Sequence, residues 1–160
     1  LGEQFCSSAL LALLAAITAV GCVIFLRYRK LKIALPIFIT GASEIIIILG
    51  FAALIRWNLD LAALAGILAA VGTGVDHQII ITDEVLRGES ATGNWNEKLK
   101  QAFFIIMAAY FTTVVAMGPL LVMGAGMLKG FAITTITGVS VGVFITRPAF
   151  AKIIEVLLKD

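Results

Sequence analysis

The chain has 160 residues, of which 61% are hydrophobic and 14% are charged, and its mean hydropathy is +1.07. Soluble globular domains are about 45–50% apolar and about 25% charged, so this composition excludes an ordinary soluble enzyme and a disordered tail. The net charge of +2 is too small for the basic surface of a nucleic-acid-binding domain. The sequence therefore predicts a non-enzymatic protein that crosses the lipid bilayer several times and binds no nucleic acid.

Five segments are candidates for transmembrane helices, each of which needs about 20 mostly apolar residues. In chain order they are 7–26, 33–55, 61–82, 103–123 and 130–146. The longest connection between them, 83–102, is polar and is expected to be a loop. We therefore expect an all-α membrane bundle of five transmembrane helices that forms a single domain over residues 1–160.

Lysine and arginine are concentrated in alternate connections. Ten of the twelve lie in the first connection, the long connection and the C-terminal segment, to which Arg147 is assigned, whereas Arg56 and Lys129 lie in the other two connections. Basic connections face the cytoplasm, which predicts a multi-pass plasma-membrane protein with a cytoplasmic C-terminus and an external N-terminal end. Because the first span begins at once, without the basic leader of a signal peptide, we expect a fragment of a longer protein.

Two carboxylates lie inside predicted spans, where a charge costs roughly 2.5–3.5 kcal/mol or more. Glu44 is about 16 Å from the cytoplasmic start of its span, and Asp76 is about 9 Å from the cytoplasmic end of its span, at about 1.5 Å per residue. Asp76 is the candidate proton-binding group. Glu44 either belongs to the same proton relay or is a protonated, hydrogen-bonded core group.

Hydroxyl groups on two further spans fall in the same slab of the bilayer. Thr112, Thr113, Thr137 and Ser140 lie about 9–14 Å from the ends of their spans. One interpretation is a polar layer in which Thr112 and Thr113 extend the relay of Asp76 and Glu44, and the other is that the hydroxyls bond to helix backbone. His77 is expected to be a hydrogen-bonded spacer, because the chain has one histidine and no second one to build a metal site.

Small residues mark two predicted helix-packing faces. They recur at every fourth position from Gly66 to Gly74, and again at Gly138 and Gly142. Such spacing allows the backbones of two helices to approach closely. Because Gly74 precedes Asp76 by two residues, we expect the Asp76 carboxyl to lie near a close helix contact.

Three runs of sequence resemble the SecD family of protein-export membrane subunits. The run GTGVDHQIIITDE at 72–84 resembles the motif of that family's fourth span. The Thr112–Thr113 pair and the run GAGMLKGFAIT at 124–134 resemble its fifth and sixth spans, and 1–2 with 27–30 resemble its second span and cytoplasmic loop. The resemblance covers nearly the whole chain. Asp-His-Gln at 76–78, where bacterial members have Asp-Ala-Asn, is similar to the archaeal branch.

The resemblance implies spans two to six of a six-span half of an RND-type transporter, without the large external domain that follows span one. It also implies an accessory role in Sec-dependent export, in which proton flow drives movements that help to pull an unfolded preprotein outward. The implied partners are a SecF-like subunit and a SecY-type translocon, and no cofactor is implied. Asp76 matches the family's membrane aspartate, and Thr112 and Thr113 match the threonine pair near it.

Two alternative functions stay open from the sequence. The chain is either a scaffold that stabilises a translocase, with Asp76 as a hydrogen-bond donor that never titrates, or an RND-type exporter of small molecules or lipids. The run that begins at Lys129 favours the export subunit over the exporter. Whether Cys6 pairs with a cysteine in the missing region is a further open question.

Overall fold

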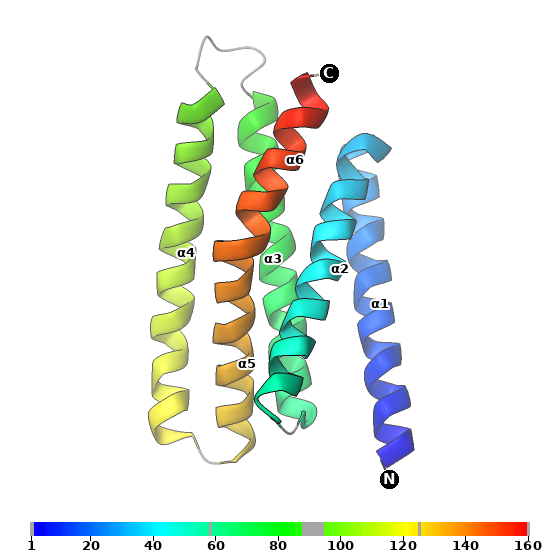
Figure 1. Ribbon diagram of the computed structural model, residues 1–160, viewed down its shortest axis with the longest axis vertical. Helices are drawn as coiled ribbons and strands as arrows, with labels where there is room; N and C mark the ends of the chain where they lie inside the picture. The colour runs from blue at the N-terminus through cyan, green and yellow to red at the C-terminus, as the bar shows by residue number, and fades with distance from the viewer. Residues whose placement is uncertain (1, 58, 88–94, 125, 160) are drawn as a thin grey trace.

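The computed structural model of the chain describes residues 2–57, 59–87, 95–124 and 126–159, and Cys6 lies outside the side chains that it describes. Consecutive membrane-length segments run in opposite directions (Figure 1). The elements are α1 (Gly2–Tyr28), α2 (Leu31–Leu54), α3 (Leu61–Arg87), α4 (Trp95–Met123), α5 (Met127–Val141), the π-helical turn η2 (Gly142–Thr146) and α6 (Arg147–Lys159). The described residues contain five continuous helical segments that are long and apolar enough to cross a membrane. The predicted bundle of five membrane helices is therefore confirmed.

The helices extend further than the apolar segments that predicted them. α3 continues to Arg87 and α4 begins at Trp95, so much of the expected loop at 83–102 is helical. The last membrane-length segment does not end at Thr146 but runs from Met127 to Leu158 through η2. Hydropathy marks the part of a helix that matches the bilayer, whereas backbone hydrogen bonding continues until a turn interrupts it.

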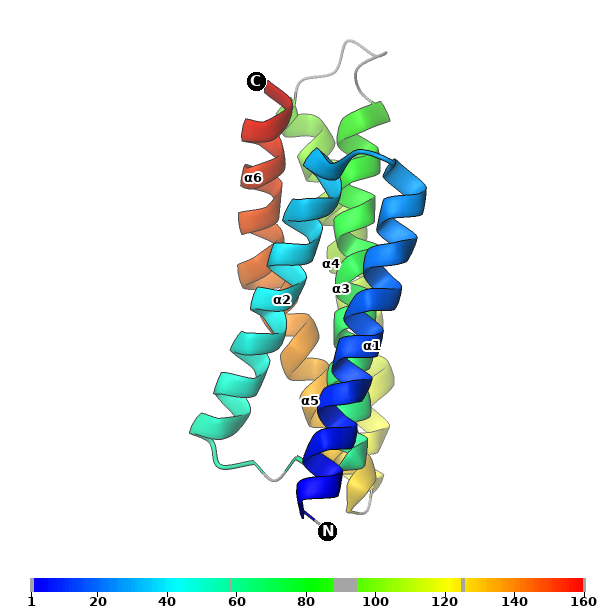
Figure 2. The same cartoon turned by 90° about the vertical axis from the view of Figure 1, so that its right-hand side faces the viewer.

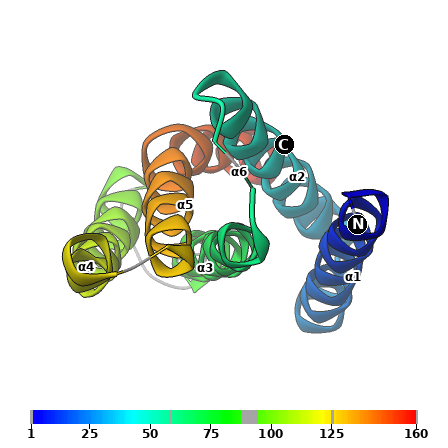
Figure 3. The ribbon, with the colours of Figure 1, turned by 90° about the horizontal axis from the view of Figure 1, so that it is seen from below.

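Two helices form the centre of the bundle. α3 and α5 lie side by side, with α4 packed against both on one side and α1 packed against α2 and α3 on the other (Figure 3). α6 continues beyond α5 and packs against α2 (Figure 2). In this arrangement α2, α5 and α6 all pack against α3.

Glycines allow the close approach of α3 and α5. A Cβ atom added at Gly66 would overlap the Thr134 side chain and lie 2.7 Å from the carbonyl oxygen of Phe131. A Cβ atom at Gly138 would overlap the Cβ atom of Ala70. The two small-residue faces therefore pack against each other. Their glycines have no side chains that would hold the two backbones apart.

The π-helical turn keeps one side of the last segment buried over several turns. Gly142, Thr146 and Phe150 are all buried, at intervals of four residues. In a regular α-helix such positions drift about 40° per step, because four residues exceed the 3.6 residues of one turn. A wider turn removes this drift. Pro148, which lacks the N–H that an α-helix requires and clashes with the preceding turn, gives a local reason for the wide turn before it.

Candidate functional site

A buried ion pair joins α2 to the start of α6. Arg147 Nη1 donates a hydrogen bond of 2.5 Å to Glu44 Oε2, and Nη2 donates one of 3.4 Å to Glu44 Oε1. Thr146 Oγ1 also donates to Glu44 Oε2, at 3.3 Å. The side chains of Arg147 and Glu44 are 0% and 1% exposed. The pair is thus fully desolvated, and each charge depends on the other for its compensation.

Two glycines provide the space for the guanidinium group. A Cβ atom added at Gly74 would lie 2.5 Å from Arg147 Nη2 and 3.0 Å from Glu44 Oε2. A Cβ atom added at Gly142 would lie 2.8 Å from the central carbon of the same guanidinium. Gly74 and Gly142 were predicted to pack helices against each other, and here they pack against an ion pair. The three elements α2, α3 and η2 therefore meet around the side chain of Arg147.

The position of Arg147 corrects the sequence analysis, which assigned this residue to a cytoplasmic segment after the last span. Arg147 instead lies within the last membrane-length segment and is buried. The sequence does contain a signal for this position. Arg147, Phe150, Ala151 and Ile154 follow the i, i+3, i+4, i+7 pattern of one helix face, and all four are buried. Without Arg147, the first connection, the long connection and the C-terminal segment still carry more lysine and arginine residues than the other two connections.

Polar groups continue the site for one helical turn along α2 and α3. Gln78 Nε2 donates a hydrogen bond of 2.8 Å to Thr40 Oγ1, and Thr40 lies one turn from Glu44 on the same face of α2. Gln78 and the adjacent His77 are 0% and 2% exposed. These groups and the ion pair form a buried polar layer, which we define as Thr40, Glu44, Gly74, His77, Gln78, Gly142, Thr146 and Arg147.

The polar layer separates two apolar parts of the core. One cluster includes Ile45, Ile48, Ile67 and Val71. The other cluster includes Ile37, Ile81, Val85, Phe150 and Ile154, together with residues of α1 and α4. Because apolar side chains close the layer on both sides, its charges and hydrogen bonds act in a low-dielectric environment, where an unpaired polar group is costly.

Asp76 lies on a different face of α3 from the polar layer. It is exposed and lines a groove of about 280 Å³ between α1 and α3, together with Ala19, Val20 and Val23 of α1. Residues two apart on a helix point in nearly opposite directions. Gly74 therefore faces the ion pair, and the expectation that its close contact lies beside the Asp76 carboxyl is wrong.

Within the described part of the chain, the hydrogen bonds of the other two predicted relay residues, Thr112 and Thr113, and of Ser140 join them to neither Asp76 nor Glu44. Thr112 and Thr113 both donate to the carbonyl oxygen of Ala109 in their own helix, at 2.8 and 2.9 Å. Ser140 also bonds to its own helix, through Ile136 O at 2.7 Å, and lies 3.2 Å from Tyr110 Oη of α4. In these contacts the hydroxyl groups bond to the backbone of their own helices, which was the second interpretation that the sequence left open.

A second polar contact joins α1 to α3 near the connection between α1 and α2. Asp83 accepts a hydrogen bond of 2.7 Å from Tyr28 Oη and one of 2.5 Å from Arg27. The side chains of Arg27 and Asp83 are 54% and 27% exposed, so water screens this ion pair and it contributes little to stability. The contact fixes the end of α1 against α3 without forming an enclosed site.

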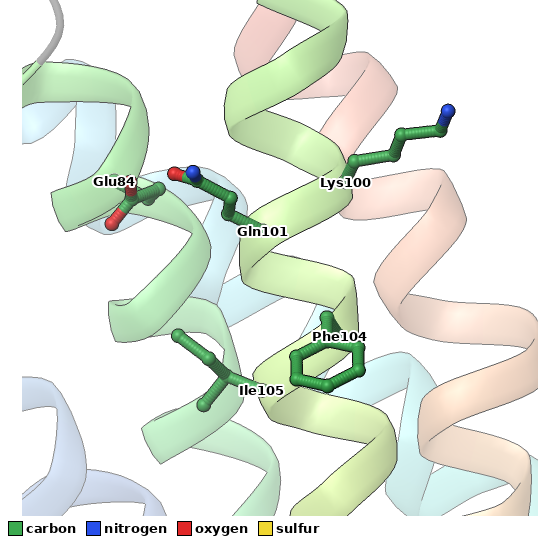
Figure 4. Close-up of a pocket in the computed structure, with 5 residues that line it drawn as sticks. All are labelled: Glu84, Lys100, Gln101, Phe104 and Ile105. Carbon is green, nitrogen blue, oxygen red and sulfur yellow. The ribbon is translucent and has the colours of Figure 1, made fainter.

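The groove between α3 and α4 lies apart from the polar layer. Its volume is about 520 Å³, and it is lined by Glu84, Lys100, Gln101, Phe104 and Ile105. Gln101 extends from α4 toward α3, whereas Lys100 extends away from α3 (Figure 4). The groove is open and is lined by one acidic, one basic, one amide and two apolar side chains, so it does not present a set of converging polar atoms.

The fold and the buried ion pair define a multi-pass helical membrane protein with a charged layer inside one bundle. Comparison with known families identifies it further. The sequence model of the family described as "Protein export membrane protein SecD/SecF, C-terminal" matches residues 1–158. The chain belongs to this family, which confirms the resemblance found in the sequence.

Individual relatives give the same result. The Protein-export membrane protein SecD of Methanocaldococcus jannaschii is 58% identical over 158 residues, which are 99% of this chain and 39% of the relative. The protein of the same name from Methanothermobacter thermautotrophicus is 52% identical, over 97% of this chain and 40% of the relative. The Protein translocase subunit SecDF of Brucella abortus is 32% identical, over 91% of this chain and 20% of the relative. The chain thus spans about two fifths of the length of the first two relatives.

Proposed function

We propose that this chain is the membrane part of an accessory subunit of Sec-dependent protein export, and that the subunit uses the proton gradient through Asp76. The membership of the chain in the SecD/SecF family supports the export role. The position of Asp76 supports the proton-binding role. Asp76 lies in a groove at the surface of the bundle, on a membrane-length helix, and the other described groups of this chain do not enclose it, whereas the Glu44 carboxylate is enclosed by Arg147 and Thr146.

The proposal gives different roles to the two carboxylates. Asp76 is the group that takes up and releases the proton. Glu44 belongs to the buried polar layer, which holds α2, α3 and α6 in one arrangement while Asp76 titrates on the far face of α3. Thr112 and Thr113 act through the shape of α4 and not as direct proton carriers, since both hydroxyls bond to the backbone of their own helix.

The energy available from one proton is sufficient for such a role. Moving one charge through the membrane potential is worth about 2.3 kcal/mol per 100 mV. This energy changes the ratio of two helix arrangements by more than tenfold, because about 1.4 kcal/mol corresponds to a factor of ten. One protonation of Asp76 per cycle is therefore enough to bias a two-state packing of the helices that border its groove, α1 and α3.

The partners in this proposal follow from the family. They are a SecF-like subunit, a SecY-type translocon and an unfolded preprotein, which would be bound by an external domain. The relative in Brucella abortus bears the name SecDF, which favours a SecF-like subunit as the neighbour of this bundle. The groove that contains Asp76 is one face available to that neighbour. The basic connections, including the one between α1 and α2, would lie on the cytoplasmic side.

The test is export of a Sec-dependent reporter by the full-length protein with its partner subunits in proteoliposomes, with and without a proton gradient. Asp76→Asn is expected to lose the gradient-dependent part of export while the protein still folds and assembles. Asp60→Asn is the matched control. Asp60 Oδ1 caps α3 by accepting a hydrogen bond of 2.7 Å from the Ala63 N–H, and asparagine caps a helix equally well. Unchanged gradient-dependent export by Asp76→Asn would contradict the proposal and favour a scaffold.

A further inference from the structure

A cluster of cations lies at the turn between α1 and α2. The turn consists of Arg29 and Lys30, because α1 ends at Tyr28 and α2 begins at Leu31. Arg29, Lys30 and Lys32 are exposed, and none of them forms an ion pair within the part of the chain that the structure describes. We call these three residues the basic turn. Its positive charges are not compensated by a described carboxylate.

Contacts on both sides hold the basic turn in place. Ile24 of α1 and Ile33 of α2 are buried in the same apolar cluster, and Tyr28 donates a hydrogen bond of 2.7 Å to Asp83 of α3. The Asp83 carboxylate also pairs with Arg27, so it is already engaged by a cation outside the basic turn. The backbone that carries the three cations therefore needs no reordering when a ligand binds.

Exposed apolar side chains border the basic turn on both helices. Leu26, Leu31 and Leu35 are each more than half exposed and belong to membrane-length segments. Apolar side chains of such segments face the acyl chains of the bilayer, whereas lysine and arginine near helix ends extend toward the lipid headgroups. The basic turn lies at the end of the bundle where α6 also ends (Figure 1). It is thus placed at the level of the headgroups, next to a surface for acyl chains.

This order of groups matches the structure of a phospholipid, in which a negatively charged phosphate adjoins the acyl chains. A zwitterionic headgroup brings a cation of its own, which the uncompensated charges of the basic turn repel. An anionic headgroup brings no such cation and is attracted by each lysine or arginine near the membrane surface. An acidic protein segment in the aqueous phase would match the charges but would leave the exposed leucines uncovered. The chemistry therefore favours an anionic phospholipid.

We propose that the basic turn is a binding site for anionic phospholipid, with the phosphate held by Arg29, Lys30 and Lys32 and the acyl chains packed along the exposed leucines of α2. The turn at the other end of α2 provides a contrast. It carries one cation, Arg56, and one carboxylate, Asp60, so its net charge is zero. This inference does not depend on the export role or on the proton gradient, and it can fail or succeed independently of them.

The experiment is photocrosslinking of the full-length protein in nanodiscs that contain equal amounts of phosphatidylglycerol, which is anionic, and phosphatidylcholine, which is zwitterionic. The crosslinker p-benzoylphenylalanine replaces either Leu31, beside the basic turn, or Leu54, beside Arg56, and both positions are exposed. Mass spectrometry identifies the lipid in each adduct. At position 31 we expect phosphatidylglycerol adducts to exceed phosphatidylcholine adducts at least about fivefold, since one lysine or arginine near an anionic surface contributes about that factor. At position 54 we expect a ratio near one. Equal ratios at the two positions would overturn the proposal, as would crosslinking of position 31 to protein instead of lipid.

Two matched variants separate the basic turn from the overall charge of the protein. Arg29 and Arg56 both have a positive φ, of 49° and 52°, a conformation that glycine adopts readily. Arg29→Gly and Arg56→Gly therefore remove the same charge from the same backbone conformation at opposite ends of α2, and both variants are expected to fold. Arg29→Gly should lower the preference for phosphatidylglycerol at position 31 about fivefold, whereas Arg56→Gly should leave it unchanged. An unchanged preference in Arg29→Gly, or an equal fall in both variants, would contradict the proposed lipid site.

Discussion

Replacing Glu44 by glutamine is expected to destabilise the bundle strongly. The substitution keeps the shape of the side chain but leaves the guanidinium of Arg147 buried, at 0% exposure, opposite a neutral amide. Removal of one partner from a buried ion pair costs about 3–5 kcal/mol. Since about 1.4 kcal/mol is a factor of ten, Glu44→Gln should change the folding equilibrium by at least two orders of magnitude.

Replacing the partner, Arg147, should destabilise the bundle less, because a carboxylate left without its partner can become neutral and a guanidinium cannot. Without Arg147, the Glu44 carboxyl can take up a proton and become neutral, and Thr146 stays beside it. Without Glu44, the guanidinium keeps its charge, because arginine does not lose its proton in proteins. We therefore expect Arg147→Met to destabilise the bundle less than Glu44→Gln does. The double variant should lose less unfolding free energy than the two single variants lose together, since it removes both charges.

The assay is reversible unfolding of the full-length protein in bicelles, with the four proteins of this double-mutant cycle compared under identical lipid conditions. The coupling energy between the two positions should exceed about 1 kcal/mol, within the range measured for contacting residues. Single effects that simply add, or a Glu44→Gln variant as stable as the wild type, would refute the view that this buried pair holds α2 against α6.

Three further predictions use the same unfolding assay. Gly74→Ala should destabilise the bundle by about 1–3 kcal/mol, because the new methyl group overpacks the ion pair, whereas Gly72→Ala should be neutral or stabilising, since nothing lies within 4 Å of its added Cβ and alanine favours a helix. Equal effects at these two glycines would contradict the packing of the guanidinium against α3. Gly66→Ala should also destabilise, because its added Cβ overlaps a threonine side chain of α5, and full stability would show that the two helices separate readily. Tyr28→Phe should cost only about 0.5–1.5 kcal/mol through its lost hydrogen bond to Asp83, so a larger loss would indicate a more central role for this contact.

The number and approximate position of the membrane helices followed from hydropathy alone. The helix ends did not, because polar residues such as those between Asp83 and Arg87 continue a helix beyond the bilayer when no turn interrupts it. The end of the last span was predicted at Thr146 because a charged residue follows it. An arginine normally ends an apolar span, unless a carboxylate on another helix compensates its charge.

The sequence by itself determined that this chain is a multi-pass helical protein, and it identified both intramembrane carboxylates and the small residues that permit close packing. These features are local, since they depend on composition, spacing and the cost of a charge in lipid. Only the tertiary structure decided which carboxylate is paired. Glu44 and Arg147 are 103 positions apart, and no local pattern relates their side chains. The fold brings them together, and Gly74 and Gly142 leave the space in which the guanidinium packs. Because Gly74 faces this ion pair, Asp76 lies on the opposite face of α3, in the groove beside α1.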